Sequence, residues 1–299
     1  MFDNTFMRKG VLLFLLILLT ASCQSPPVTP SVPLAMTETM TSTPLPAFDE
    51  LIHIFDYDPS VPLDARWGDE QARGDAILQS LTYLAPENCR AQAILVRPDG
   101  PGPYPAIIYM HRGGADKTQF EDEAVLLAGQ GVVALLLDAP FLTGCGDVND
   151  PRQGYIRTVL FVRRGVDLLE SLPQVDPARI AYVGHSFGAT WGGVLAGVEP
   201  RLRVFVLMAG YAQISQHDSP EVPDLDAVLY VGHAEGAAFL FQFSTSDHYI
   251  SQEDAQQYYD AASGEKTILW YDSTHAGLQE DGQADRLQWL GGHLGFAAP

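Results

Sequence analysis

The residues best suited to chemistry in this chain lie in the pentapeptide Gly184-His185-Ser186-Phe187-Gly188. A short apolar run at 180–183 precedes it and small residues follow, so the sequence predicts a strand, a tight turn and a helix. A serine on such a turn projects its hydroxyl above the sheet, as in a nucleophile elbow. Gly184 and Gly188 fit this turn because a Cβ there would clash with the neighbouring strand and helix backbones. Ser186 is therefore the candidate nucleophile.

A serine hydroxyl needs a base within hydrogen-bonding reach before it attacks at neutral pH. His275 is the candidate base, because it follows a predicted strand at 267–271 after a short loop. Asp247 follows another predicted strand, and its carboxylate would orient the imidazole and stabilise the charged form. Asp272, on the same loop as His275, remains an alternative acid. The sequence thus predicts a Ser186, Asp247, His275 triad.

The loop His111-Arg112-Gly113-Gly114 follows a predicted buried strand at 106–110. We expect backbone N–H groups of this loop, together with that of Phe187, to face the negative charge that develops on the substrate oxygen. The Arg112 guanidinium would either reach a substrate carboxylate or fold outward into solvent. The sequence has no His or Cys spacing typical of a metal site and no Gly-rich phosphate loop, so we expect neither metal nor cofactor.

Ser186, Asp247 and His275 lie far apart in the sequence, so the fold must bring them together at one edge of a sheet. Predicted strands alternate with predicted helices from residue 106 onward, which indicates a mostly parallel sheet with helices on both faces. Two earlier strands, at 76–84 and 91–97, would form an antiparallel edge. Active residues in such sheets lie at the carboxyl ends of strands, which is where Ser186, Asp247 and His275 are placed.

The first 47 residues differ from the rest in composition. Arg8 and Lys9 precede a short apolar run at 11–19, and small residues lead to Cys23, a pattern typical of a secretory signal peptide. The placing of Cys23 resembles a bacterial lipobox, whose lipidated cysteine would anchor the protein to a membrane without spanning it. An ordinary secreted protein or a retained anchor helix is the alternative. Residues 24–47 are rich in Pro, Ser and Thr, which predicts a disordered tether.

Net charge, cysteine content and chain length limit the possible binding partners and the domain organisation. The chain of 299 residues has a formal net charge of −20, which excludes nucleic-acid binding through phosphate neutralisation. Cys89 and Cys145 are compatible with pairing in an extracytoplasmic compartment, but the sequence leaves the disulfide open. The expected organisation is a signal peptide at 1–22, a tether at 23–47 and one α/β domain at 48–299. Residues 48–63 are expected to lie on the surface of that domain as an arm.

On these motifs the chain resembles the α/β-hydrolase superfamily, most closely the dienelactone hydrolase-like and acetyl-esterase-like serine hydrolases. The residues that carry the resemblance are Tyr104-Pro105-Ala106, His111, the run at 175–180, Ser186, Asp247 and His275. The resemblance implies an eight-stranded, mostly parallel sheet and the triad named above. It also implies oxyanion amides from Arg112 or Gly113 and from Phe187. Serine replaces the nucleophilic cysteine of dienelactone hydrolases proper, which favours general ester hydrolysis.

The expected activity is hydrolysis of small-molecule carboxylic esters with small or medium acyl groups, through an acyl-enzyme and outside the cytoplasm. Only a short segment, 209–237, separates two predicted strands, so a large lipase-type lid is not expected. One alternative is a serine peptidase of the prolyl oligopeptidase-like type, although no β-propeller precedes the domain. Another is a catalytically silent binding lipoprotein, against which the ordered Ser, Asp and His residues count. The oligomeric state is not predicted.

Overall fold

The computed structural model describes residues 45–146 and 150–299. Within these ranges one sheet of nine strands runs in the order β1-β2-β3-β5-β4-β6-β7-β8-β9. The strands are β1 (Arg66–Arg73), β2 (Ala76–Leu84), β3 (Arg90–Pro98), β4 (Tyr104–Met110), β5 (Val133–Leu137), β6 (Val175–His185), β7 (Val204–Met208), β8 (Ala238–Ser244) and β9 (Glu265–Tyr271). The expectation of eight strands was wrong, because the sheet also contains β1. This strand could not be predicted, since all of its residues are exposed and form no apolar pattern.

The predicted pairing is confirmed. β1, β2, β3 and β5 pair antiparallel in that order, whereas β5, β4, β6, β7, β8 and β9 pair parallel. The parallel part therefore brings the carboxyl ends of β4, β6, β7, β8 and β9 to one edge of the sheet, where ligands bind in folds of this kind.

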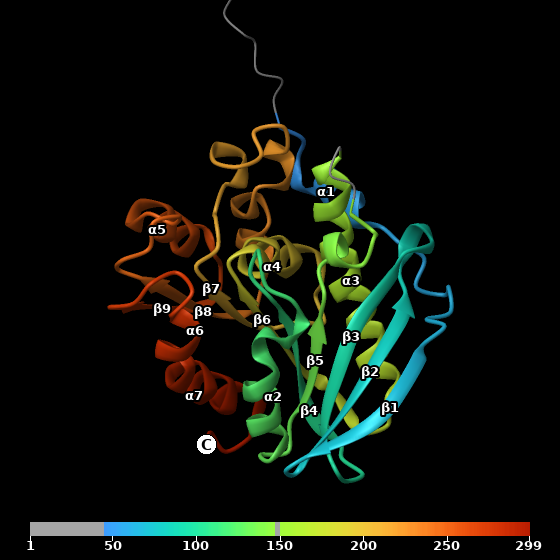
Figure 1. Cartoon of the computed structure of the whole chain (residues 1–299). Helices are drawn as coiled ribbons and strands as arrows, with labels where there is room; N and C mark the ends of the chain where they lie inside the picture. Colours follow the sequence, from blue (N-terminus) through green and yellow to red (C-terminus); the bar gives the residue numbers. More distant parts are fainter. Residues whose placement is uncertain (1–44, 147–149) are drawn as a thin grey trace, which may run out of the picture. The chain divides into compact units, whose positions relative to one another are not determined.

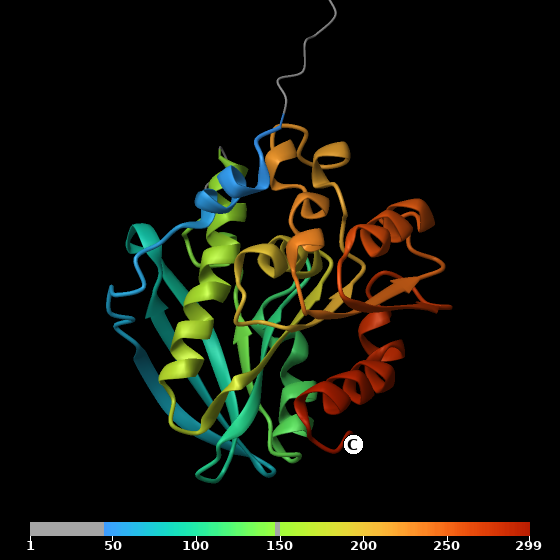
Figure 2. The ribbon, with the colours of Figure 1, turned by 180° about the vertical axis from the view of Figure 1, so that it is seen from behind.

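Helices cover both faces of the sheet (Figures 1 and 2). On one face lie α2 (Glu121–Ala128) and α7 (Gln283–Leu294). On the other face α3 (Pro151–Ser171) packs beside α4 (Phe187–Val198). The shorter α5 (Gln252–Ala261) connects β8 to β9, and α6 (Leu278–Asp281) lies between β9 and α7. No helix within the described ranges is long and apolar enough to cross a membrane.

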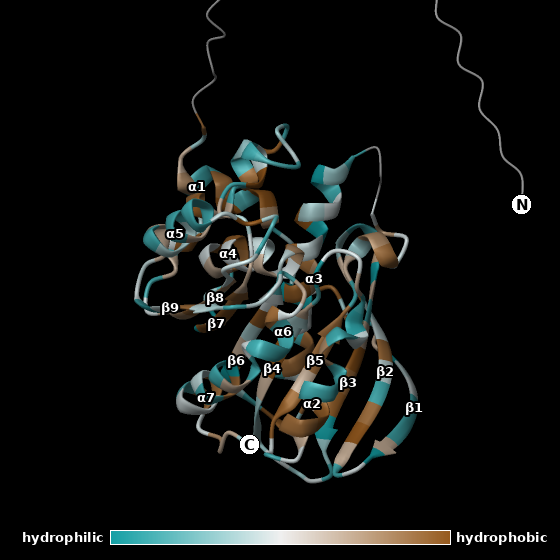
Figure 3. Cartoon of the chain, turned by 60° about the vertical axis from the view of Figure 1, so that its left-hand side comes forward, coloured by the Kyte–Doolittle hydropathy of each residue, from teal (hydrophilic) through white to brown (hydrophobic). Residues whose placement is uncertain are grey.

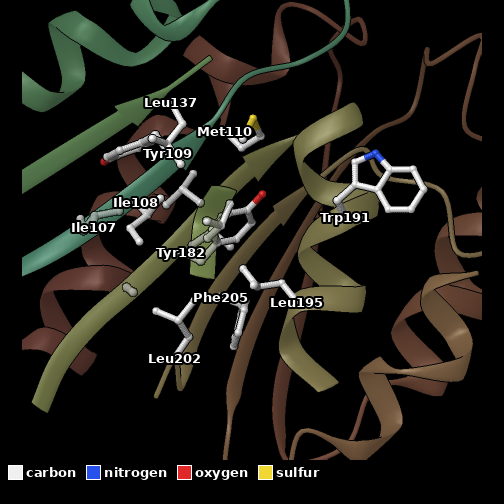
Figure 4. Close-up of a cluster of buried hydrophobic side chains, with 14 of the residues drawn as sticks. Ile107, Ile108, Tyr109, Met110, Leu137, Tyr182, Trp191, Leu195, Leu202 and Phe205 are labelled. Carbon is white, nitrogen blue, oxygen red and sulfur yellow. The ribbon is translucent and has the colours of Figure 1, made fainter. Parts of the chain in front are cut away.

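Burial follows the layers. β5 and β8 are buried along their whole length, and β4 and β7 are buried after their first residue. A strand that is covered on both faces reads as a continuous apolar run, which is why these strands were predicted. Figure 3 shows hydrophobic colouring along β3, β4 and β5 and hydrophilic colouring along β1. Figure 4 shows how side chains from β4, β6 and β7 meet those of α4 to form the core on that face.

The arm at 48–63 is more than a surface segment. Its short helix α1 (Phe48–Leu51) and the turn at Ile52–Phe55 bury the side chains of Leu51 and Phe55. The Phe55 ring packs edge-on against Tyr230 with 5.8 Å between centroids, and its carbonyl accepts a hydrogen bond from Arg163. The apolar residues of the arm therefore belong to the core of the domain, which corrects the expectation of a surface position.

Cys89 and Cys145 form a disulfide, with their Cα atoms 5.7 Å apart. The bond joins the β2–β3 connection to the loop after β5, so the pairing left open by the sequence is present. The predicted signal peptide, the lipidation site Cys23 and all of the predicted tether except residues 45–47 lie outside the described residues.

Candidate active site

Ser186 occupies a strained turn between β6 and α4. Its φ of 53° and ψ of −107° lie in a region that non-glycine residues rarely adopt, so the surrounding structure must hold it there. The Ser186 amide donates to the Met208 carbonyl at 2.7 Å, at the end of β7. A Cβ at Gly184 would meet the Gly188 backbone, and one at Gly188 would meet the Met110 carbonyl. Both glycines are thus required by close backbone approach, as the sequence predicted.

Asp247 and His275 meet although 28 residues separate them. His275 Nδ1 donates to Asp247 Oδ2 at 2.7 Å, and both side chains are buried. Burial alone would raise the pKa of Asp247. Hydrogen bonds from His275 and from the amides of Tyr249 and Ile250 nevertheless hold that pKa below its usual value. Asp272 is exposed and makes no hydrogen bond to His275 within the described ranges, so the geometry favours Asp247 as the partner of the imidazole.

Ser186 and His275 line one cavity of about 340 Å³ at the carboxyl edge of the sheet. No hydrogen bond joins the Ser186 hydroxyl to the imidazole in the described part of the chain. Contacts between nucleophile and base are often longer in unliganded sites than in the complex with substrate. A small molecule in this cavity would therefore be next to both the Ser186 hydroxyl and the His275 imidazole.

The amides near Ser186 differ in whether they are already engaged. The Arg112 amide donates to Gln119 Oε1 at 2.9 Å, so it is not free for a substrate oxygen. Gly113 and Phe187 both line the cavity, and neither amide has a hydrogen-bond partner among the described residues. Of the two loop amides that the resemblance implied, the geometry favours that of Gly113. The Arg112 guanidinium lines the cavity without a carboxylate partner in the ranges described.

A buried polar network links the two loops of the site. Gln119 Nε2 donates to His185 Nδ1 at 2.8 Å, and His185 Nε2 donates to the His275 carbonyl at 2.8 Å. Burial lowers the pKa of His185 to about 3, so this side chain stays neutral at ordinary pH. Through Gln119 Oε1 the network continues to the Arg112 amide. Sequence reasoning missed Gln119, since no motif marks it.

Besides the loops that carry Gly113, Tyr249 and His275, three parts of the chain form the walls of the cavity. Phe187, Thr190 and Trp191 share one face of α4, because residues three and four apart are neighbours on a helix. Tyr155 comes from the start of α3. The segment 209–237, which forms four short 3₁₀ turns, adds Tyr211, Ile214 and Asp218. No motif marks this segment as part of the site, because its cavity-lining residues follow no regular spacing.

The sheet order, the strained Ser186 turn and the Asp247–His275 pair define an α/β-hydrolase fold, as the resemblance implied. Solved structures agree. An acetyl xylan esterase from Paenibacillus sp. R4 has a TM-score of 0.68 at 19% identity, over 83% of this chain and 93% of that one. Acetyl xylan esterase 1 from Thermoanaerobacterium sp. JW/SL YS485 has a TM-score of 0.67 at 16% identity, over 81% and 92%.

A sequence relative is the 2,6-dihydropseudooxynicotine hydrolase of Paenarthrobacter nicotinovorans. It is 28% identical over 123 residues, which are 40% of this chain and 32% of that protein. The chain therefore matches about a third of the length of this relative. No protein-family model matches the chain.

Proposed function

We propose that this protein is a serine hydrolase that cleaves carboxylic esters of small or medium acyl groups. The observation that carries the proposal is the single cavity lined by Ser186 and by His275, whose imidazole is oriented by Asp247. The esterase and hydrolase names of the structural neighbours and of the sequence relative agree with this activity.

In the proposed reaction, Ser186 Oγ forms a bond to the ester carbonyl carbon while His275 Nε2 takes the hydroxyl proton. The amides of Gly113 and Phe187 donate to the carbonyl oxygen as it becomes negative. The tetrahedral intermediate then breaks the bond to the alcohol, which leaves with the proton from His275. A water molecule releases the acid from Ser186 by the same steps, with His275 again as the base.

In this reaction Asp247, Gln119 and His185 position other groups and do not react themselves. Asp247 holds His275 with Nδ1 protonated, so that Nε2 is the atom free to accept the serine proton. His185 fixes the backbone of the loop that carries His275, and Gln119 fixes the loop that carries Gly113. Together they set the distance between the base and the oxyanion amides.

We further propose an extracytoplasmic, lipid-anchored location, with Cys23 as the modified residue. The Cys89–Cys145 disulfide supports an oxidising compartment. Mass spectrometry of the membrane-extracted protein tests the anchor: a mature chain that begins at a diacylated Cys23 is expected. A mature chain that begins elsewhere and carries no lipid would contradict it.

Kinetics on a short p-nitrophenyl ester test the activity. Ser186→Ala is expected to lower kcat/KM by about 10⁴-fold or more, since nucleophile and base act as one unit. Ser80→Ala, at an exposed serine of β2 that does not line the cavity, serves as the control and is expected to keep the wild-type rate. Equal rates for wild type and Ser186→Ala would refute the proposal. Cleavage of peptide amides but not esters would favour the peptidase alternative.

A further inference from the structure

The cavity beside Ser186 is walled by aromatic rings. Five aromatic side chains line it, namely Tyr155, Phe187, Trp191, Tyr211 and Tyr249. Aromatic rings offer large apolar faces and prefer offset or edge-to-face contact with other rings. The ester-hydrolase mechanism above uses none of these rings, so they are free to determine which ester is accepted.

One wall is held in place before any ligand arrives. Tyr155 and Trp191 stack with 4.4 Å between ring centroids and 24° between planes, and Phe187 meets Trp191 edge-on at 6.1 Å. The Tyr155 hydroxyl shares a hydrogen bond with Ser219 at 2.7 Å, which fixes its ring. A preorganised wall costs little ordering entropy when a ligand binds.

A second aromatic side belongs to other elements. The Tyr211 ring stacks on His217 at 4.4 Å, and its amide donates to Thr190 Oγ1 at 3.0 Å, so this ring too is anchored. The Tyr249 ring packs edge-on to His275 with 4.9 Å between ring centroids, yet the residue is 55% exposed. An exposed ring beside the base gains apolar contact only when a ligand covers it.

Trp191 supports the first wall from behind. It is 2% exposed, and Figure 4 shows its indole projecting from α4 away from the strand side chains. The less buried rings of the cavity, those of Tyr155, Phe187, Tyr211 and Tyr249, therefore offer most of the aromatic surface that a ligand can contact.

We infer that the substrate is an ester that carries an aromatic ring. The ring lies against the wall formed by Tyr155 and Phe187, which Trp191 supports, with Tyr211 on the other side. This inference rests on the proposed ester hydrolysis and names its substrate class. The ring belongs to the acid or to the alcohol part of the ester, and the experiment below distinguishes the two.

The test compares esters that differ only in the ring. For the acid side, methyl 3-phenylpropanoate is compared with methyl 3-cyclohexylpropanoate. For the alcohol side, 2-phenylethyl acetate is compared with 2-cyclohexylethyl acetate. The two-carbon spacer keeps the intrinsic reactivity of the carbonyl alike within each set. On one side, the full-length enzyme is expected to prefer phenyl over cyclohexyl about three- to tenfold in kcat/KM, the value of one good ring contact.

Two variants test the ring contacts. Tyr155→Leu removes a ring from the first wall, so the preference for phenyl over cyclohexyl is expected to shrink. Tyr211→Leu removes a ring from the other side, and the same preference is expected to shrink. Because Tyr211 belongs to a different element, its result stands even if Tyr155→Leu folds poorly.

The outcomes separate the two proposals. Active hydrolysis with equal kcat/KM for phenyl and cyclohexyl esters on both sides overturns the aromatic-substrate inference and leaves the esterase function intact. Faster cleavage of a peracetylated sugar than of any aryl ester also overturns it, in favour of a carbohydrate substrate. Failure to hydrolyse every ester, together with no reaction of Ser186 with a fluorophosphonate, overturns the esterase function itself.

Discussion

Glu123 and Asp247 are two of the buried carboxylates that pair with a basic side chain, and their surroundings differ. Glu123 and Arg286 are 2% and 0% exposed, and Arg286 also donates to the Gln242 side chain and the Gln279 carbonyl. Tyr109 donates a further hydrogen bond to Glu123. By contrast, His275 is held by Asp247 at Nδ1 and has no partner at Nε2 among the described residues. The first pair is saturated by the protein, and the second leaves one atom for a ligand.

This difference separates a structural pair from a candidate catalytic pair. A buried ion pair whose hydrogen bonds are all made contributes to the framework, and removing one partner leaves an uncompensated charge. A pair that leaves one ring nitrogen of the histidine unpartnered beside a cavity can accept a proton from a ligand or donate one to it. We therefore expect changes to the Asp247–His275 pair to lower activity and changes to the Glu123–Arg286 pair to lower stability.

The largest effect is expected at Asp247. Asp247→Asn should lower kcat by about 10³- to 10⁴-fold, because the amide no longer selects the imidazole tautomer that accepts the serine proton. Ester turnover under saturating substrate is the measurement. Asp272→Asn, on the same loop as His275 but exposed, is the matched control and should retain activity. Equal losses in the two variants would show that the Asp247–His275 pair is not the one that matters.

At the other pair the loss should appear in stability. Arg286→Met leaves the Glu123 carboxylate buried and unpaired, so the free energy of unfolding should fall by about 3–5 kcal/mol. Urea unfolding measures it, and the folded fraction should keep its kcat within a few fold. Arg73→Met removes two exposed ion pairs, with Glu121 and Asp122, and should leave the free energy of unfolding close to that of wild type. A large fall in kcat in folded Arg286→Met would erase the distinction between the pairs.

The next effect concerns acid stability. The folded-state pKa of His185 is lowered to about 3, mainly by burial, so between pH 6.5 and 3 only the unfolded chain binds this proton. The contribution of neutral His185 to the free energy of unfolding is therefore lost as the pH falls from 6.5 towards 3. His185→Gln should make the loss of unfolding free energy between pH 7 and pH 5 smaller by about 2 kcal/mol. His53→Gln, at an exposed histidine, should leave the profile as in wild type; an unchanged profile for His185→Gln would contradict the buried neutral state.

The smallest effect is expected in the network between the loops. Gln119→Leu breaks both side-chain hydrogen bonds and should lower kcat about tenfold with little change in KM, since two lost hydrogen bonds at about 0.7 kcal/mol each amount to about 1.4 kcal/mol. Gln119→Glu keeps an acceptor for the Arg112 amide and loses the donor to neutral His185, so its kcat should lie between Gln119→Leu and wild type. A rise in KM alone, with kcat unchanged, would show that Gln119 acts in substrate binding instead.

The sequence predicted the parts of the fold that rest on local patterns. Strands buried on both faces read as apolar runs, and parallel order then brings the residues after each strand to one edge, so the meeting of Asp247 with His275 was foreseeable. Strand β1 was missed because its residues are all exposed. Tyr211 and Asp218 were missed because irregular turns place them at the cavity.

Gln119 escaped prediction for a different reason. Its side chain reaches Arg112 seven positions before it and His185 sixty-six positions after it, and such contacts follow from packing rather than from any periodicity. The same holds for Phe55, whose burial depends on how the arm meets Tyr230. Contacts of this kind become visible only in the folded chain.

Covalent labelling of Ser186 tests the central claim most directly. The full-length protein is treated with a fluorophosphonate, and the modified peptide is identified by mass spectrometry. The account predicts a single stoichiometric adduct on Ser186, with labelling slowed at least a hundredfold in His275→Ala because the base is gone. Absence of an adduct on Ser186 in the folded wild-type protein, or equal labelling rates in wild type and His275→Ala, would contradict it.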